Sequence, residues 1–228
     1  MTGRCLAQMF KLDLVVLAAV NRFIWPASAG AVTAAQRGVE QIPLTTKLRA
    51  VCVTGMWAFA VYSFYTYLGS ALSDVVGLST GVVPGALIVY GLGAVVGSLS
   101  GGRLADRYGA GRIATISLLS LAATLLLVDA LIHTPAWQLL ASLGVFALTA
   151  YPCLPAYQSR LVTTFPTASG SLLAWISFFI YLGTSVSAAV GGVVLTGPGF
   201  RWIPILGAVV ALIGALIYQR SLPRKAEV

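Results

Sequence analysis

The 228-residue sequence is 58% hydrophobic and only 9% charged, and it carries a formal net charge of +8. Soluble domains carry about a quarter charged residues, so this composition excludes an ordinary water-soluble fold and indicates a membrane protein. The basic excess does not indicate nucleic-acid binding, because the fourteen lysines and arginines are scattered among apolar runs and form no continuous basic face.

The first forty-odd residues are the least regular part of the chain. Residues 12–35 are apolar on average, but Arg22 and Pro26 interrupt them, and an arginine in the centre of a span is costly. A seventh span is therefore an alternative, not the main prediction. A secretory signal peptide is a second alternative, because Lys11 precedes the apolar run, although Asp13 at its head argues against this interpretation.

From Arg49 onward the sequence is a series of six apolar stretches. Roughly 20 apolar residues in a helix cross the core of a bilayer, and each stretch is long enough. The predicted spans are 51–72, 81–101, 112–132, 137–162, 171–195 and 202–219. The links between them are rich in Gly, Pro, Ser and Asp, which end helices. Apolar runs of about twenty residues do not fit the shorter alternating strands of a barrel.

These patterns predict an all-α, polytopic membrane protein with a bundle of six transmembrane helices. The predicted domains are an N-terminal cytoplasmic or linker segment (1–47), the six-helix transmembrane domain (48–222) and a cytoplasmic tail (223–228).

The basic residues predict the orientation, since Lys and Arg that flank spans favour the cytoplasmic side. With both termini in the cytoplasm, thirteen of the fourteen lie inside and only Arg201 lies outside. The inside residues are Arg4, Lys11, Arg22, Arg37, Lys47, Arg49, Arg103, Arg107, Arg112, Arg160, Arg220, Arg224 and Lys225. We therefore expect a multi-pass protein of the plasma or inner membrane.

Small residues four apart lie on one helix face and allow the close helix packing that lipid requires. Two spans carry such seams: Gly93, Gly97 and Gly101 in the second, and Gly183, Ser187 and Gly191 in the fifth. In the fourth span Pro152 and Pro155 each remove a backbone hydrogen bond, so this helix is predicted to be bent.

The link after the second span carries the most specific motif, GGRLADRYGAGR at residues 101–112. Its glycines permit a tight reversal between helices, and an interfacial Asp can face basic neighbours and the positive end of a helix. A contact of this kind can form in one conformation and break in another. The candidate conformational residues are Gly102, Arg103, Asp106, Arg107, Gly109 and Arg112.

This motif resembles the loop signature of the major facilitator superfamily, in which a Gly, an Asp-Arg pair, a second Gly and one or two basic residues join two helices. Gly111 departs from the pattern, because the family often has Arg or Lys there. Other segments resemble the C-terminal six-helix half of the drug and sugar efflux branch. WAFAVYSFYTYL looks like its seventh helix, QIPLTTKLRA like the end of the linker between the halves, and PCLPAYQSRL and ASGSLLAWISFFIYLGTSVSAAVGG like helices ten and eleven. The resemblance covers about residues 42–222.

The resemblance implies secondary active transport of a small solute by alternating access, with efflux as the expected direction and proton exchange as the expected drive. An aromatic-rich cavity without fixed charge would suit a neutral or apolar solute. The implied partners are the lipid bilayer, a small-molecule solute, and either a second copy or a missing N-terminal half. Polar and aromatic residues within the spans are the candidates to line a cavity, with helix packing or an interfacial aromatic belt as the alternative for each. They are Trp57, Tyr62, Tyr65, Tyr90, Tyr151, Gln158, Trp175 and Tyr181.

Proton coupling needs an ionisable group in the membrane, and Asp129 is the candidate, with a simple interfacial carboxylate as the alternative. Asp74 and His133 lie in predicted outer links. Three cysteines are too few and too dispersed for a disulfide framework or a metal site, and no cofactor is expected.

Three interpretations remain open. The chain is a half-length transporter that works as a homodimer or with a partner half, or a truncated product that does not transport. An intramembrane enzyme is the third and least supported, because the only His lies in a link and no two acids face one another mid-membrane.

Overall fold

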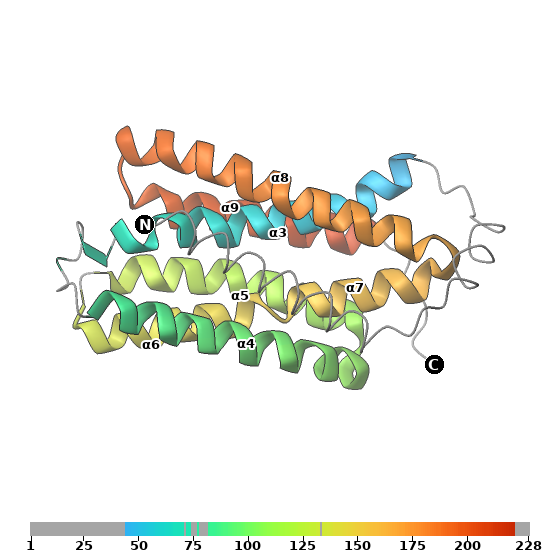
Figure 1. Ribbon diagram of the computed structural model, residues 1–228, viewed down its shortest axis with the longest axis horizontal. Helices are drawn as coiled ribbons and strands as arrows, with labels where there is room; N and C mark the ends of the chain where they lie inside the picture. Colours follow the sequence, from blue (N-terminus) through green and yellow to red (C-terminus); the bar gives the residue numbers. More distant parts are fainter. Residues whose placement is uncertain (1–43, 71, 74–76, 78–81, 133, 222–228) are drawn as a thin grey trace, which may run out of the picture. The chain divides into compact units, whose positions relative to one another are not determined.

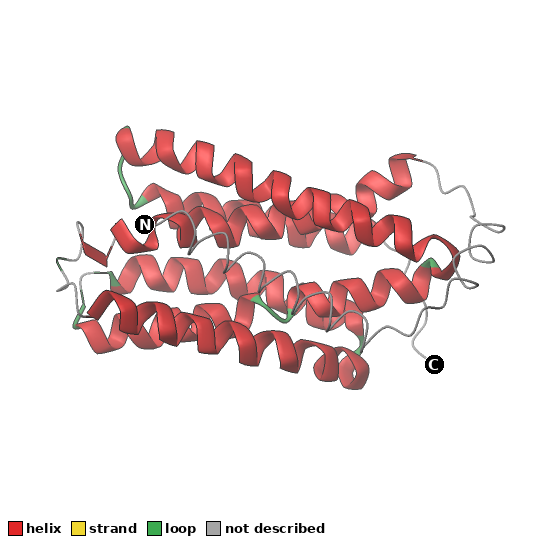
Figure 2. Cartoon of the chain, in the orientation of Figure 1, coloured by secondary structure: helices red, strands yellow, loops and turns green. Residues whose placement is uncertain are grey.

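The computed structural model describes residues 44–70, 72, 73, 77, 82–132 and 134–221. Most of the predicted N-terminal segment, the alternatives of a seventh span or a signal peptide, Asp74, His133 and the predicted tail lie outside the described residues. All described elements belong to one unit of the chain, Gln41–Val228. Within the described residues every regular element is a helix (Figure 2).

The helices follow the predicted spans closely. They are α3 (Leu44–Ser70), α4 (Val82–Tyr108), α5 (Ala110–Leu131), α6 (Ala136–Ala150), α7 (Cys153–Thr164), α8 (Ser169–Thr196) and α9 (Trp202–Ser221), with a short 3₁₀ turn at Pro166–Ala168. Six stretches of the described residues are long and apolar enough to cross a membrane, and α6 and α7 together make the fourth. The protein is an all-helical, multi-pass membrane protein, as predicted.

The fourth span is broken where the prolines predicted a bend. α6 ends at Ala150 and α7 begins at Cys153, with a turn at Tyr151 and Pro152 between them. Pro152 has no N–H and cannot continue the backbone ladder of α6. The two helices still follow one another along the bundle, so the span continues with an interruption in its middle (Figure 1).

The link after α4 is far shorter than the sequence indicated. The predicted second span ended at residue 101, but α4 continues to Tyr108 and α5 starts at Ala110, so only Gly109 separates them. Gly109 has a positive φ of 89°, a conformation that side chains with a Cβ rarely adopt. The predicted boundary was wrong because Arg103, Leu104 and Ala105 are good helix formers, and no proline stops the helix.

Packing within the bundle centres on α3 and α5. α3 packs against α8 and α9, α5 packs against α6, α7 and α9, and α4 packs against α6 and α7. In Figure 1, α8 and α4 lie at opposite edges of the bundle, and few of their side chains are buried. α3 is the most buried of the six spans.

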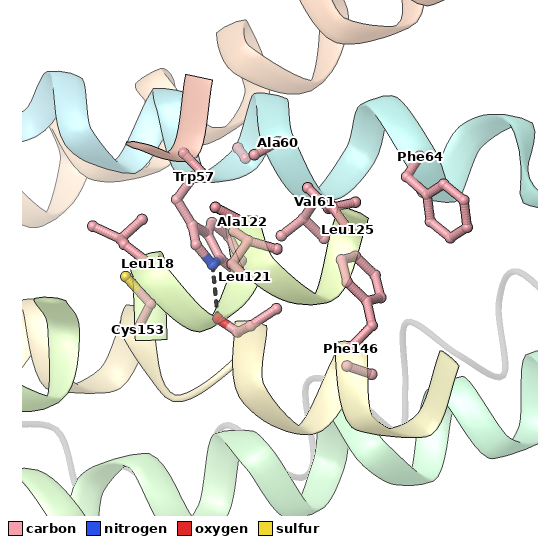
Figure 3. Close-up of a cluster of buried hydrophobic side chains, with 14 of the residues drawn as sticks. Trp57, Ala60, Val61, Phe64, Leu118, Leu121, Ala122, Leu125, Phe146 and Cys153 are labelled. Atoms are coloured by element: carbon pink, nitrogen blue, oxygen red, sulfur yellow. Dashed lines mark hydrogen bonds between the residues drawn. The ribbon is translucent and has the colours of Figure 1, made fainter. Parts of the chain in front are cut away.

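The core lies where α3, α5 and α6 meet. Figure 3 shows Trp57, Val61 and Phe64 of α3 facing Leu121 and other apolar side chains of α5. Phe146 of α6 closes the cluster, and its ring centroid lies 5.5 Å from that of Phe64. In a bilayer this packing holds the helices together by van der Waals contact, since lipid offers no hydrophobic gain.

Both predicted seams are close helix contacts. A Cβ on Gly183 would overlap the backbone oxygen of Gly55, so α3 and α8 meet backbone to backbone there. Similarly, a Cβ on Gly93 would lie 2.6 Å from the carbonyl oxygen of Gly144, and one on Gly97 would lie 2.7 Å from that of Leu148. The small residues therefore set the spacing of the α3–α8 and α4–α6 pairs.

Candidate functional site

Five of the eight aromatic and polar candidates come together as one aromatic cluster. Its members are Trp57, Tyr62 and Tyr65 of α3, Tyr90 of α4, and Tyr151 at the break in the fourth span. The Tyr65 and Tyr90 rings are stacked with centroids 4.9 Å apart. The Trp57 and Tyr151 rings meet edge to face at 5.8 Å. Three separate spans thus contribute to one surface of rings.

The cluster combines flat apolar faces with hydroxyl groups. The hydroxyl oxygens of Tyr90 and Tyr151 lie 3.0 Å apart and share a hydrogen bond. Trp57 and Tyr90 are buried, while Tyr65 is 39% exposed. None of the five side chains carries a formal charge in its usual state. Such a surface can stack against a ring or an apolar solute and can exchange hydrogen bonds with a neutral polar group.

The break in the fourth span lies beside this cluster and receives donors from two other helices. Trp57 Nε1 donates to the carbonyl oxygen of Ala150 at 2.8 Å, the bond drawn in Figure 3. Ser117 Oγ of α5 donates to the carbonyl oxygen of Thr149 at 2.6 Å. The sequence gives no signal for Ser117, one of many serines in apolar runs, and no sequence period predicts which carbonyl it meets.

The other three candidates are not among the rings of the aromatic cluster. Trp175 packs against Phe178 and Phe179 of its own helix, α8, with ring centroids 6.0 and 6.2 Å away. Tyr181, also on α8, is 73% exposed, and Gln158 is half-buried on α7.

The conformational motif lies at the end of the bundle where α4 ends and α5 begins. Gly101 and Ala105 are buried on the inner face of α4, and the charged side chains of the motif point outward. The exposed ones are Arg103, Asp106, Arg107 and Arg112. The motif is therefore two helix ends joined at Gly109, with a buried small-residue face and an exposed charged face.

Arg160, near the end of α7, reaches the same end of the bundle. Its Nη1 donates to the hydroxyl of Tyr218 on α9 at 2.9 Å, and its guanidinium carbon lies 5.1 Å from the centre of that ring. A Cβ on Gly111 would overlap Nη1 of Arg160. Arg160 thus joins α5, α7 and α9, a role that the positive-inside pattern alone does not reveal.

Asp129 lies at the opposite end of the bundle. Its Oδ2 is 3.7 Å from Nε of Arg201, which precedes α9. The Asp129 side chain is 14% exposed and that of Arg201 is 82% exposed. The pair links the end of α5 to the start of α9.

Within the described part of the chain, no three His, Cys, Asp or Glu side chains gather as metal ligands.

Comparisons with known proteins match this chain to a family. The model of the Major Facilitator Superfamily matches residues 48–228. An uncharacterized MFS-type transporter, YbcL of Bacillus subtilis, is 26% identical over 194 residues, which are 82% of this chain and 50% of that protein. The inner membrane transport protein YdhP of Escherichia coli K12 is 26% identical over 181 residues, 79% of this chain and 46% of that protein. The chain spans about half the length of the curated relatives it matches.

Proposed function

Since the chain belongs to the Major Facilitator Superfamily, we propose that it forms half of a secondary transporter that moves a small solute by alternating access. The family carries out transport and is generally not enzymatic, so an intramembrane enzyme is not retained. The proposed direction is efflux. This direction rests on the likeness of residues 42–222 to the C-terminal half of the drug and sugar efflux branch.

The proposed solute class rests on the residues of the aromatic cluster. Rings from α3, α4 and the break in the fourth span converge there, and Tyr65 remains partly exposed. A neutral or apolar solute can stack on these rings and exchange hydrogen bonds with the hydroxyls of Tyr90 and Tyr151. A multiply charged anion would find no opposite charge among the five cluster side chains, and its desolvation would not be offset.

The proposed orientation follows from the described charges. Arg103, Arg107 and Arg112 are exposed at one end of the bundle, and Arg160 and Arg220 belong to helix ends at that same end (Figure 1). Arg201 is at the other end. Basic residues beside spans favour the cytoplasm, so we place the motif end on the cytoplasmic side of a plasma or inner membrane. For both termini, the basic residues of the sequence support a cytoplasmic location.

In this proposal the motif residues act in the conformational change: Gly102, Arg103, Asp106, Arg107, Gly109 and Arg112. Asp129 is the proposed proton site, supported by its place in α5 and its largely buried carboxylate. Gln158, Trp175 and Tyr181 remain proposed lining residues, which would face the solute from positions outside the aromatic cluster.

A second candidate function is a membrane subunit that needs another half before anything is transported. One observation favours it: the chain matches only about half the length of the relatives YbcL and YdhP. The partner is then either a second copy of this chain or a different six-helix half.

Purified chain in lipid vesicles separates these candidates. The mass of the detergent-solubilised protein gives its oligomeric state, and the flux of a neutral aromatic dye is compared with that of a multiply charged anionic dye. A dimer with flux of the neutral dye supports a self-sufficient half-transporter. A monomer without flux supports the partner-dependent subunit, and strong flux of the anionic dye contradicts the proposed solute class.

Two variants test whether the aromatic cluster meets the solute. Tyr65→Ala removes the partly exposed ring that stacks on Tyr90 and should raise the half-saturating concentration of the neutral dye severalfold. Trp137→Ala removes an exposed ring at the start of α6 and serves as the control, with an unchanged half-saturating concentration expected.

A further inference from the structure

The break in the fourth span creates a need for hydrogen-bond donors. The last four carbonyl groups of a helix have no partner within that helix, and in α6 these include Thr149 and Ala150. Water that could bond them is absent from a bilayer core, where an unsatisfied backbone group costs several kcal/mol. The side chains that donate hydrogen bonds to these carbonyl groups therefore stabilise the observed bend.

Two buried side chains from other helices supply donors there. Trp57 Nε1 on α3 donates to the oxygen of Ala150 at 2.8 Å, and Ser117 Oγ on α5 donates to Thr149 at 2.6 Å and to Ala150 at 3.2 Å. Trp57 is 2% exposed and Ser117 is 4% exposed. An indole N–H can only donate, so the Trp57 bond has a fixed direction.

α4 holds the same break by close packing. A Cβ on Gly101 would lie 2.7 Å from Cα of Pro152 and 2.8 Å from Cγ of Pro155. A Cβ on Gly97 would lie 2.7 Å from the carbonyl oxygen of Leu148. In an α-helix this oxygen accepts from the N–H of residue 152, but Pro152 has no N–H. The break thus lies between the glycine face of α4 and donors from α3 and α5.

Trp57 differs from Ser117 in one respect, since it also belongs to the aromatic cluster. Its ring meets Tyr151 at 5.8 Å and Tyr62 at 6.5 Å, both edge to face. One side chain therefore contacts the proposed solute surface with its ring and the break with its N–H. Any shift of the indole away from the break would lengthen its bond to Ala150 and also change its contact with Tyr151.

We propose that Trp57 is a positioning residue that couples solute binding at the aromatic cluster to the bend of the fourth span. The inference rests on the proposed function and adds the residue that transmits binding. Without solute at the aromatic cluster, the indole N–H donates to the carbonyl oxygen of Ala150 and stabilises the bend. With solute on the rings, the bond is released and α7 moves relative to α6.

The test measures the distance across the break directly. Val145 on α6 and Val162 on α7 are both exposed and carry spin labels after change to cysteine, in a chain whose three native cysteines are replaced by alanine. Double electron–electron resonance in lipid vesicles then gives the α6–α7 distance distribution with and without the neutral dye.

Three variants are compared. Trp57→Phe keeps an aromatic ring but removes the donor. Ser117→Ala removes the other donor without touching the cluster. Ser142→Ala is the matched control, since this buried hydroxyl of α6 donates to Leu139 of its own helix at 2.7 Å.

The expected results differ between the variants. Without dye, Trp57→Phe should give the distribution that wild type reaches only with dye, and dye should cause no further shift. Ser117→Ala should broaden the distribution but keep the shift, and Ser142→Ala should match wild type. In flux assays Trp57→Phe should lower the maximal rate more than it changes the half-saturating concentration.

A Trp57→Phe chain with the wild-type distribution and an intact dye shift overturns the proposal. If Trp57→Phe does not insert as a single species, benzothienylalanine at position 57, which replaces the N–H by sulfur at nearly the same shape, gives the same two outcomes. A wild-type chain that transports nothing instead supports the partner-dependent subunit over a self-sufficient half-transporter. The dye-free comparison of Trp57→Phe with Ser142→Ala still decides whether the indole N–H sets the bend.

Discussion

The guanidinium of Arg160 occupies the space that a side chain at position 111 would fill. A Cβ on Gly111 would overlap Nη1 of Arg160, and the same nitrogen donates to the hydroxyl of Tyr218 at 2.9 Å. At position 111 the family motif often has a basic side chain. In this chain a basic group from α7 lies over that position.

Gly111→Ala should therefore break the Arg160–Tyr218 bond. The end of an arginine side chain can move, so the expected cost is that of a hydrogen bond, about 1 kcal/mol, seen as a lower midpoint of thermal unfolding in detergent. Gly85→Ala is the matched control, because Gly85 is also in a first helical turn and a Cβ there meets nothing within 4 Å.

A double-mutant test isolates that contact. In an Arg160→Met background, Gly111→Ala should change the midpoint no more than Gly85→Ala does, because the clashing group is gone. An equal effect of Gly111→Ala with and without Arg160 would contradict the assigned contact.

Gly183→Ala should be more damaging, because its new methyl group overlaps backbone. The nearest atom is the carbonyl oxygen of Gly55, which cannot move unless α3 and α8 separate. Overpacking of this kind costs about 1–3 kcal/mol and should lower both the unfolding midpoint and the yield of folded protein. Gly91→Ala in the middle of α4, where a Cβ meets nothing within 4 Å, should be neutral or stabilising. Equal midpoints for the two variants would refute the α3–α8 seam as a spacing element.

Asp106→Asn should impair transport and leave insertion intact. Asp106 is exposed in the last turn of α4, next to the amino-terminal end of α5 and the basic side chains of the motif. The amide keeps the size of the side chain but loses the charge that these groups attract. Flux in vesicles reports the first effect, and the amount and elution volume of the protein report the second. An unchanged flux would rule out a conformational role for Asp106.

Asp129→Asn should abolish the dependence of flux on a proton gradient if Asp129 carries the proton. Arg201→Ala is the comparison, since it removes the partner 3.7 Å away and keeps the carboxylate. Arg201 is largely exposed, so its loss should lower stability by less than about 1 kcal/mol. Gradient-driven flux that persists in Asp129→Asn would leave the Asp129–Arg201 pair with a structural role only.

Hydropathy predicted the six spans, and the prolines predicted a bend in the fourth, which the structure shows as a break after Ala150. The end of α4 was wrong, since Gly101 and Gly102 suggested a stop but lie within the helix. The reason is physical: a glycine weakens a helix by only about 1 kcal/mol, and the good helix formers Arg103, Leu104 and Ala105 that follow continue α4 to Tyr108.

The candidate site was predictable in residue type but not in arrangement. Trp57, Tyr65 and Tyr151 were predicted as lining residues because they are aromatic residues within spans, and all three contact other rings of the cluster. Residue type alone did not distinguish them from Trp175 and Tyr181, which are also aromatic residues within a span but lie on α8 outside the cluster. The donors to the break depend on how three helices are placed in space, which no single segment encodes.

Most described hydroxyl groups with assigned bonds in these helices donate to a carbonyl of their own helix, three or four residues earlier, as Ser63, Thr124 and Thr184 do. Such a hydroxyl is satisfied as soon as its helix forms, so it can enter the bilayer before any neighbour arrives. The bonds from Trp57 and Ser117 to the fourth span form only once separate helices have met. Membrane helices insert first and associate afterwards, so these two bonds belong to the second stage and mark the moment at which inserted segments become an assembled bundle.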